Sequence, residues 1–344
     1  MFDYFFIFGL VFLSAFAAAL LVRRLALFFK ILDRPGERKI HSRPMPLLGG
    51  LAIFVAFFAW LFIFSERFLA GDLDWPQLVG FFVGAIWLML GGFLDDKYGL
   101  KPSQQIIFPL LAVLSVILGG VEIAKLTNPW GGFFVLGASL ISPILIFFWL
   151  FGLMYTTKLL DGVDGLVSGV SAIGGLVIFL FTLTTKYYQP DLALAALIFA
   201  AACLGFLALN FHPAKIFLGE GGSLLLGYIL GVLAIISGGK IAITLLVMGL
   251  PVLDVLWTII RRLAKGRNPF KAADKKHLHF RFLELGWSQT KTVFTYYALA
   301  LIFGASGLFL QSRGKIWALS VLGLLMLGIV IGFWALDRRR EKSA

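Results

Sequence analysis

The sequence predicts an all-α, polytopic membrane protein with about eleven transmembrane helices, 10 to 11, in one integral membrane domain over residues 1–344. The chain is 60% hydrophobic and only 14% charged, which is too apolar for a soluble core. Apolar runs of about 20 residues recur from end to end, separated by short polar breaks. The single cysteine, Cys203, lies in one of these runs, so the fold depends on no intramolecular disulfide.

The apolar runs define the expected helices in chain order. The first contains Asp3 instead of a basic start and is too long for the core of a signal peptide, so we expect a span there. The predicted spans cover residues 3–29, 48–65, 77–94, 105–120, 139–157, 166–185, 191–209, 220–237, 241–259, 291–311 and 316–336.

Basic residues set the expected orientation. The formal net charge is +12, and Lys and Arg gather after the first span, after the ninth span and in the C-terminal tail. The positive-inside rule makes these segments cytoplasmic and puts the N-terminus outside. This distribution explains the charge better than nucleic-acid binding does. The predicted cytoplasmic loops that would form the active site are residues 30–47, 95–104, 158–165, 210–219 and 260–290.

Two acidic clusters stand beside predicted spans, where ionisable groups are costly and usually line a site. Asp95 and Asp96 close the third span, and adjacent carboxylates on a helix project about 100° apart, so they can serve different roles. Asp161 and Asp164 follow the fifth span, three residues apart, in an arrangement that suits Mg²⁺ and phosphate chemistry. Taken alone, each cluster could equally be a solvated turn.

Two further clusters fall on the same predicted face. Residues 210–223 form a glycine-rich approach to a helix, which can expose N–H groups to a phosphate or can simply cap the helix. The basic segment 261–281 could hold a pyrophosphate or could be only a topological stop. Its His277 and His279 lack the spacing of a helical zinc pair, so a structural or phosphate-facing role is expected.

Taken together, the clusters resemble the motifs of the polyprenyl-phosphate N-acetylhexosamine-1-phosphate transferases, the MraY/WecA superfamily of the glycosyltransferase 4 type. The resemblance runs from about residue 30 to residue 290, and motif order and spacing make it specific. The first loop has the form typical of the WecA-like branch. The matching stretches are residues 33–41 with Pro44, Pro46, Gly49 and Gly50; Asp95-Asp96 with Gly99-Leu100; residues 161–166; residues 213–220 with Gly222-Ser223; and residues 274–279 with Gly286.

The resemblance implies an enzyme that moves an N-acetylhexosamine 1-phosphate from a UDP-sugar, expected to be UDP-N-acetylglucosamine, to undecaprenyl or another polyprenyl phosphate. UMP would be released, and the product would start a lipid-linked cell-envelope glycan, such as lipopolysaccharide or cell wall. The resemblance also implies Mg²⁺, or Mn²⁺ in its place, and a cytoplasmic active site in a bacterial-type plasma (inner) membrane. It allows a homodimer. The metal would neutralise the pyrophosphate while the enzyme aligns two anions.

The resemblance assigns expected roles to particular residues. The catalytic residues would be Asp95, Asp96, Asp161 and Asp164, with Asp95 the candidate base or phosphate-orienting carboxylate. Glu220 and Asp161 would be metal ligands. Asn210 and Phe217 would hold the uridine. The full set expected to bind substrate is Lys39, His41, Lys158, Asn210, Lys215, Phe217, His277 and His279.

The chain departs from the family pattern at a few positions. The family usually has asparagines three and six residues before Asp161, where this chain has Lys158 and Tyr155. The family motif that matches residues 213–220 normally ends in Asp, where this chain has Glu220, and Phe280 stands where a further His is common. Glu remains a hard oxygen ligand. The ammonium of Lys158 would either repel a metal ion or supply part of its charge at the pyrophosphate.

Three other functions compete with this interpretation. A transporter or channel also has many spans with buried charges, but these charges gather at one face and not at the midplane. A catalytically degenerate member would bind lipid phosphate or UDP-sugar without turnover. A CDP-alcohol type transferase would need further motif residues after Asp161 and Gly162 that this chain lacks. We rank the active transferase first, the degenerate binder second and the transporter third.

Overall fold

The long apolar helices confirm a multi-pass helical membrane protein. The computed structural model describes residues 2–36, 41, 43–69, 71, 73–128, 130–136, 140–184, 188–238, 240–264, 266 and 277–343, so Lys39 and residues 274–276 lie outside the described part. Within that part, eight helices are long and apolar enough to cross a membrane. They are α1 (Phe2–Phe28), α4 (Trp75–Tyr98), α7 (Ile141–Leu160), α9 (Pro190–Asn210), α10 (Gly219–Ile236), α11 (Ile241–Ala264), α13 (Gln289–Phe309) and α14 (Ser312–Ser343).

Three shorter apolar helices occupy the remaining predicted spans: α2 (Gly49–Ile63), α6 (Ile107–Leu118) and α8 (Leu166–Thr182). Several helices extend beyond their predicted ends, most of all α14, which was predicted to stop at residue 336 and continues to Ser343. The difference that matters for the site is at α4, which was predicted to stop at residue 94 and continues to Tyr98. Gly99, with φ of 66°, then ends the helix and donates its N–H to the Asp95 carbonyl at 2.8 Å. Asp95 and Asp96 therefore lie in the last helical turn.

Short elements occur in segments that the sequence suggested only as connections. The strand β1 (Leu32–Asp33) pairs antiparallel with β2 (Met45–Pro46), and β3 (Lys125–Thr127) pairs with β4 (Phe133–Val135). The short helices are α3 (Ser65–Leu69), α5 (Pro102–Gln105) and α12 (Leu278–Glu284). Runs of two or three strand residues carry too little periodicity to be recognised in a sequence.

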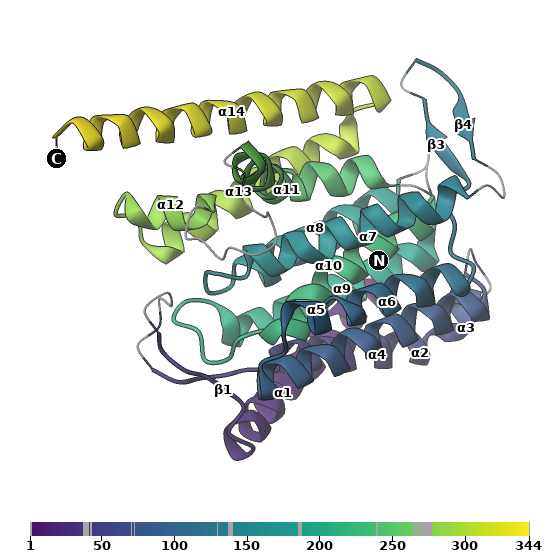
Figure 1. Ribbon diagram of the computed structural model, residues 1–344. Coiled ribbons are helices and arrows are strands. Elements are labelled where there is room, and N and C mark those ends of the chain that lie inside the picture. The colour runs from purple at the N-terminus through teal and green to yellow at the C-terminus, as the bar shows by residue number, and fades with distance from the viewer. Residues whose placement is uncertain are drawn as a thin grey trace.

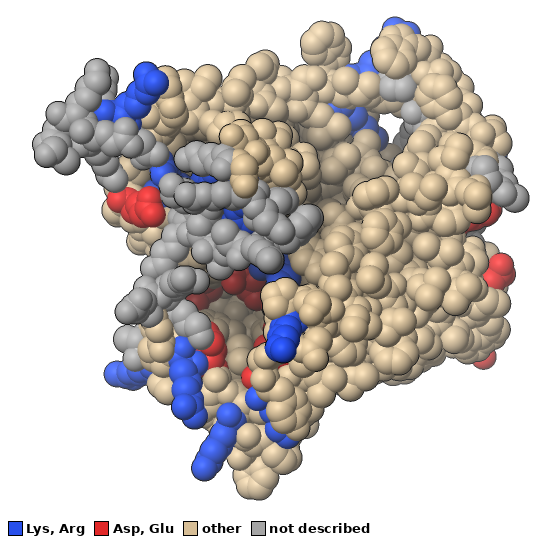
Figure 2. Space-filling model, in the orientation of Figure 1, with Lys and Arg blue, Asp and Glu red and all other residues tan. Residues whose placement is uncertain are grey.

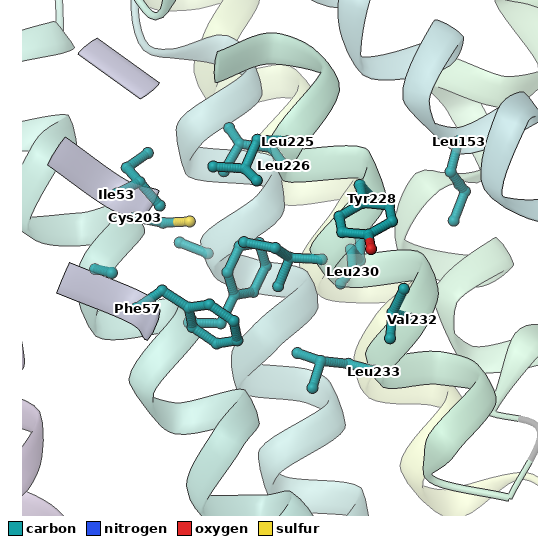
Figure 3. Close-up of a cluster of buried hydrophobic side chains, with 14 of the residues drawn as sticks. Ile53, Phe57, Leu153, Cys203, Leu225, Leu226, Tyr228, Leu230, Val232 and Leu233 are labelled. Carbon is teal, nitrogen blue, oxygen red and sulfur yellow. The ribbon is translucent and has the colours of Figure 1, made fainter. Parts of the chain in front are cut away.

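The helix α10 lies at the centre of the core. Figure 3 shows its side chains Tyr228, Leu230 and Leu233 with Ile53 and Phe57 of α2 nearby, and the Tyr228 hydroxyl donates to the Phe81 carbonyl at 2.9 Å. Glycines bring the backbones together: a Cβ built on Gly92 of α4 would lie 2.2 Å from the Gly221 Cα of α10. Small residues at such contacts are how membrane helices pack closely.

The helices run roughly side by side in Figure 1, with β1 and α12 at one end of the bundle and α3 and the β3–β4 hairpin at the other. The C-terminus lies at the first of these ends. In the same orientation, Figure 2 shows a hollow there with acidic side chains inside it and basic side chains around it, while the flank of the bundle is almost free of charge. The polar clusters therefore meet at one end.

Candidate active site

A cavity of about 620 Å³ opens at this end of the bundle. It collects side chains from the segment after α1 and from the facing ends of α4, α7, α9 and α10, which are far apart in sequence. This convergence was predicted, although the individual partners were not. The predicted site residues that line the cavity are His41, Asp96, Lys158, Asp161, Asp164, Asn210, Phe217 and Glu220.

Asp96 is fixed in the cavity wall by the start of α10. Its Oδ1 accepts the Glu220 backbone N–H at 3.1 Å, as a carboxylate at a helix N-terminus commonly does. The preceding Gly219 has φ of 75°, and a Cβ there would lie 2.3 Å from the Asp96 Oδ2. Only glycine suits this position, so Gly219 lets the start of α10 approach the Asp96 carboxylate.

Asp95 has a different environment from its neighbour. Its Oδ1 accepts the Leu100 N–H at 2.7 Å and the Gln105 side-chain amide at 3.0 Å. It is not among the described residues that line the cavity. These contacts hold the connection from α4 to α5, which makes Asp96 the better placed of the two carboxylates to meet a substrate. The predicted role of Asp95 as base stays a prediction.

Lys158, in the last turn of α7, forms an ion pair with Glu220 in the first turn of α10. Its Nζ also donates to the Gln105 Oε1 at 3.2 Å. The two side chains of the ion pair are only 21% and 20% exposed. Lys158 and Glu220, two of the positions at which the chain departs from the family pattern, thus contact each other directly. Gln105, which the sequence analysis did not single out, connects Lys158 to Asp95.

Asp161 directly follows α7 and faces the cavity. Desolvation by the surrounding protein raises the pKa of Asp161 to about 8, and the negative charges of Glu220, Asp96 and Asp164 raise it in the same direction. The side chain is nevertheless exposed to the open cavity.

The Asp161 environment predicts a dependence of stability on pH. Because the pKa is about 8 in the folded protein and near 3.8 in an unfolded chain, unfolding releases a proton between these values. The melting temperature in detergent should therefore fall as pH rises from 4 to 8, and Asp161→Asn should remove part of that fall. Asp3→Asn, in the exposed first turn of α1, serves as the control. Equal slopes in wild type and Asp161→Asn would contradict the assignment.

Asp164 shapes the loop between α9 and α10. Its Oδ2 lies 2.9 Å from the His212 Nδ1 and accepts the Ala214 N–H at 3.1 Å. Asn210 acts on the same loop, because its Nδ2 donates to the Ile216 carbonyl at 3.0 Å and its Oδ1 accepts the Ser168 hydroxyl at 2.8 Å. Both side chains line the cavity, but the protein uses their polar atoms to hold the loop in shape.

Phe217 and His41 form one wall of the cavity. Their ring centroids are 5.3 Å apart, in an edge-to-face arrangement at 71°. The His41 Nε2 lies 2.9 Å from the Asp33 Oδ2, and its Nδ1 lies 2.8 Å from the Arg43 carbonyl. An aromatic face held in this way suits a planar base. Lys215 is exposed and is not among the described residues that line the cavity, and Lys39 lies outside the described part.

His277 and His279 lie beside the cavity floor and not among its described lining residues. The His277 Nδ1 lies 2.9 Å from the Oδ2 of Asp254, and the Asp254 Oδ1 accepts the Leu278 N–H at 3.0 Å. Asp254, in α11, was missed by the sequence analysis, although an aspartate inside an apolar span was a usable signal. It fixes the start of α12.

His279 is fully buried against the acidic loop that contains Asp161. A Cβ on Gly162 would lie 2.7 Å from its Nε2, so the glycine leaves room for the ring. Burial lowers the pKa of His279 to about 3, and the nearby His277 acts in the same direction. The ring is therefore neutral at physiological pH. Of the two roles expected for His279, structural or phosphate-facing, this buried position favours the structural one.

The predicted metal ligands do not form a preformed metal site. In the described part of the chain, no three side chains of His, Cys, Asp or Glu converge closely enough to hold an ion. Glu220 is paired with the Lys158 ammonium, whose charge repels a divalent cation. The donor set therefore does not fit an ion held by Glu220 together with Asp161. The Mg²⁺ or Mn²⁺ requirement stays a prediction from the resemblance.

A bundle of membrane helices with a polar, acidic cavity at one end defines a polytopic membrane enzyme as the class of this protein. The sequence profile described as glycosyl transferase family 4 matches residues 78–238. The chain is 33% identical over 321 residues to the probable undecaprenyl-phosphate N-acetylglucosaminyl 1-phosphate transferase of Bacillus subtilis, with 91% of this chain and 85% of the relative covered.

Two further relatives agree. The chain is 30% identical to the decaprenyl-phosphate N-acetylglucosaminephosphotransferase of Mycolicibacterium smegmatis, with 94% of this chain and 86% of the relative covered. It is 31% identical to the undecaprenyl-phosphate alpha-N-acetylglucosaminyl 1-phosphate transferase of Thermotoga maritima, with 81% of each covered. The chain belongs to glycosyl transferase family 4, in the WecA-like branch of the polyprenyl-phosphate N-acetylhexosamine-1-phosphate transferases. The predicted family and the phosphotransferase class of enzyme are confirmed.

Proposed function

We propose that the protein transfers N-acetylglucosamine 1-phosphate from UDP-N-acetylglucosamine to a polyprenyl phosphate and releases UMP. One observation carries the assignment of both substrates to this site. Asp96 lines the polar cavity and also lines an apolar groove of about 280 Å³ between α2, α4 and α10. A polar donor and a lipid acceptor can therefore meet at a single carboxylate.

The chemistry needs alignment more than covalent help from the protein. An oxygen of the acceptor phosphate attacks the β-phosphorus of the donor and forms a new P–O bond. The bond from the β-phosphorus to the bridging oxygen breaks, and UMP leaves with the electron pair. Asp96 would take the remaining proton of the phosphate monoester or orient it, and Phe217 with His41 would hold the uracil.

The proposed topology has all eleven apolar helices crossing the membrane, with the N-terminus outside and the cavity and C-terminus in the cytoplasm. It is supported by the Lys and Arg residues of the sequence, which gather after α1, after α11 and in the C-terminal tail, and by the C-terminus, which lies at the cavity end in Figure 1. The inner membrane of a bacterial-type cell is the proposed location. The lightly buried α14 would face lipid or the second copy of a homodimer.

The groove is the proposed path of the isoprenoid chain. Its lining includes Leu51 and Phe54 of α2 and Ile86, Met89 and Leu90 of α4. Apart from Asp96, these side chains are apolar, as a hydrocarbon chain requires. Leu90 is 42% exposed, so a larger side chain there can fill the groove without disturbing the core.

Leu90→Trp is expected to raise the KM for polyprenyl phosphate by about tenfold, because the indole occupies volume that the lipid needs. The KM for the UDP-sugar should stay unchanged, because Leu90 lines the groove but is not among the described residues that line the polar cavity. Leu301→Trp on α13, at a site 48% exposed, controls for a tryptophan on the lipid-facing surface. An equal rise in both KM values, or no rise at all, would show that the acceptor uses another path.

The proposed function is tested by UMP release from purified, detergent-solubilised protein. The assay supplies undecaprenyl phosphate and a panel of UDP-sugars, each with and without the lipid. We expect lipid-dependent release that is fastest with UDP-N-acetylglucosamine. Release with a different sugar would correct the donor. Folded protein that binds UDP but releases no UMP with any donor would instead indicate the degenerate binder.

A further inference from the structure

The lysine in the cavity lies among carboxylates. Asp96, Asp161, Asp164 and Glu220 all line the cavity that the donor diphosphate would have to enter. Without a nearby positive charge, these groups would repel a diphosphate. Arg43 and Lys158 are the Lys and Arg side chains among the described lining residues, and Arg43 is exposed on the loop after α1. Lys158 is only 21% exposed, so its charge is screened less by solvent.

The position of the ammonium is set by its partners. Lys158 pairs with Glu220 and donates to the Gln105 Oε1 at 3.2 Å, and the Gln105 amide in turn donates to the Asp95 Oδ1 at 3.0 Å. The ring of Tyr155 lies 5.5 Å from the Lys158 Nζ. An ammonium has three N–H donors, so these two polar partners leave it one for a phosphate oxygen.

The departures at positions 158 and 220 form one interacting unit. Lys158 and Glu220 carry opposite charges, so the pair is neutral as a whole, whereas Glu220 without the lysine would add a further negative charge to the cavity. The same ion pair occupies Glu220 as a metal ligand, and no described group of three donors replaces it. The ion pair therefore supplies a cation to the cavity and leaves Glu220 unavailable as a ligand for another one.

We propose that the Lys158 ammonium, and not a divalent cation held by the protein, is the positive charge that this cavity offers to the donor diphosphate. The inference rests on the proposed function and names the group that binds the diphosphate in that site. Lysine serves as a point charge for phosphate, and a charge-assisted hydrogen bond to the bridging oxygen or to the α-phosphate would strengthen as negative charge moves onto the departing UMP. Glu220 and Gln105 are positioning residues for the ammonium.

Binding of UDP, measured by isothermal titration calorimetry with EDTA present, tests the proposal independently of turnover. Wild type should bind UDP in EDTA within about twofold of its affinity in Mg²⁺. Lys158→Met should weaken binding in EDTA by about tenfold or more, whereas Lys158→Arg, which keeps the charge, should retain most of it. Lys101→Met removes an exposed ammonium that is not among the described lining residues and should leave binding unchanged.

A double variant controls for the possibility that Lys158→Met unfolds the protein. If Lys158→Met leaves Glu220 unpaired and unfolds the protein, Lys158→Met with Glu220→Gln removes both charges and should fold while binding UDP weakly in EDTA. In the double variant Lys158→Asn with Glu220→Asp, binding of UDP should depend on Mg²⁺. This variant should also bind Mn²⁺, as detected by electron paramagnetic resonance, whereas the wild-type protein should show no bound Mn²⁺.

The outcomes separate this inference from the proposed function. UMP release by wild type in EDTA, at a rate within about twofold of that in Mg²⁺, would support both. Release or UDP binding by wild type only when Mg²⁺ is added would overturn the inference and leave the transferase intact. If no UMP is released under any condition, the proposed function fails, and UDP binding in EDTA that depends on Lys158 would still support the inference.

Discussion

Asp96→Asn is expected to lower the kcat of UMP release by a factor of about 10²–10⁴, the range typical of a lost general base or orienting carboxylate. Asp96 borders both the polar cavity and the apolar groove, so it lies where the two substrates meet. Asparagine has nearly the same shape and keeps an oxygen for the Glu220 N–H, which lies 3.1 Å from the Asp96 Oδ1. The substitution therefore changes charge and basicity more than structure.

The matched control is Asp95→Asn, because Asp95 is adjacent in sequence but holds the α4–α5 connection instead of lining the cavity. It should lose far less of kcat than Asp96→Asn does, while both variants keep the UDP affinity within a few fold. The opposite ranking would return the role of base to Asp95 and would mean that the cavity wall rearranges when substrates bind.

Asp254→Ala is expected to destabilise the protein by an amount on the order of 2–5 kcal/mol, the largest effect on stability that we anticipate. Asp254 and His277 are each 4% exposed, and the carboxylate contacts both the His277 Nδ1 and the Leu278 N–H. Removing it leaves two buried polar groups without their partner. The change should appear as a lower melting temperature in detergent.

The effect of Asp254→Ala on UDP binding distinguishes the loss of the Asp254 contacts to α12 from a general loss of packing. His279 follows on α12 and packs against Gly162 of the acidic loop, so a displaced α12 should also weaken UDP binding. Cys203→Ser changes a fully buried side chain in α9, away from the cavity lining, and should lower stability without affecting UDP affinity in the folded fraction. Unchanged stability in Asp254→Ala would contradict the anchoring role.

The helices and their order could be predicted from sequence because apolar runs of the necessary length report directly on the membrane environment. The meeting of the first three polar clusters, with His279 beside them, could also be predicted, since the alternation of spans places them on one face. The end of α4 was less accessible to prediction. Its last turn is polar, so hydropathy stops at residue 94 while the helical hydrogen bonds continue to Gly99.

The partners of individual side chains could not be predicted in the same way. The pairing of Lys158 with Glu220 depends on how the ends of α7 and α10 approach each other, which no local pattern encodes. The separate roles of Asp95 and Asp96 arise because one carboxylate turns toward Gln105 and the other toward α10. The position of Asp254 inside an apolar span was visible in the sequence, but its partner was not, because His277 is 23 residues away.

The central claim is that this cavity transfers the sugar together with its phosphate. Donor labelled with ³²P at the β-phosphate, incubated with undecaprenyl phosphate and the purified protein, tests it most directly. We predict that the label moves into the lipid product and that the released UMP is unlabelled, with both signals reduced by Asp96→Asn. Label that leaves in UDP while the sugar alone reaches the lipid, or transfer that is unaffected by Asp96→Asn, would contradict the account.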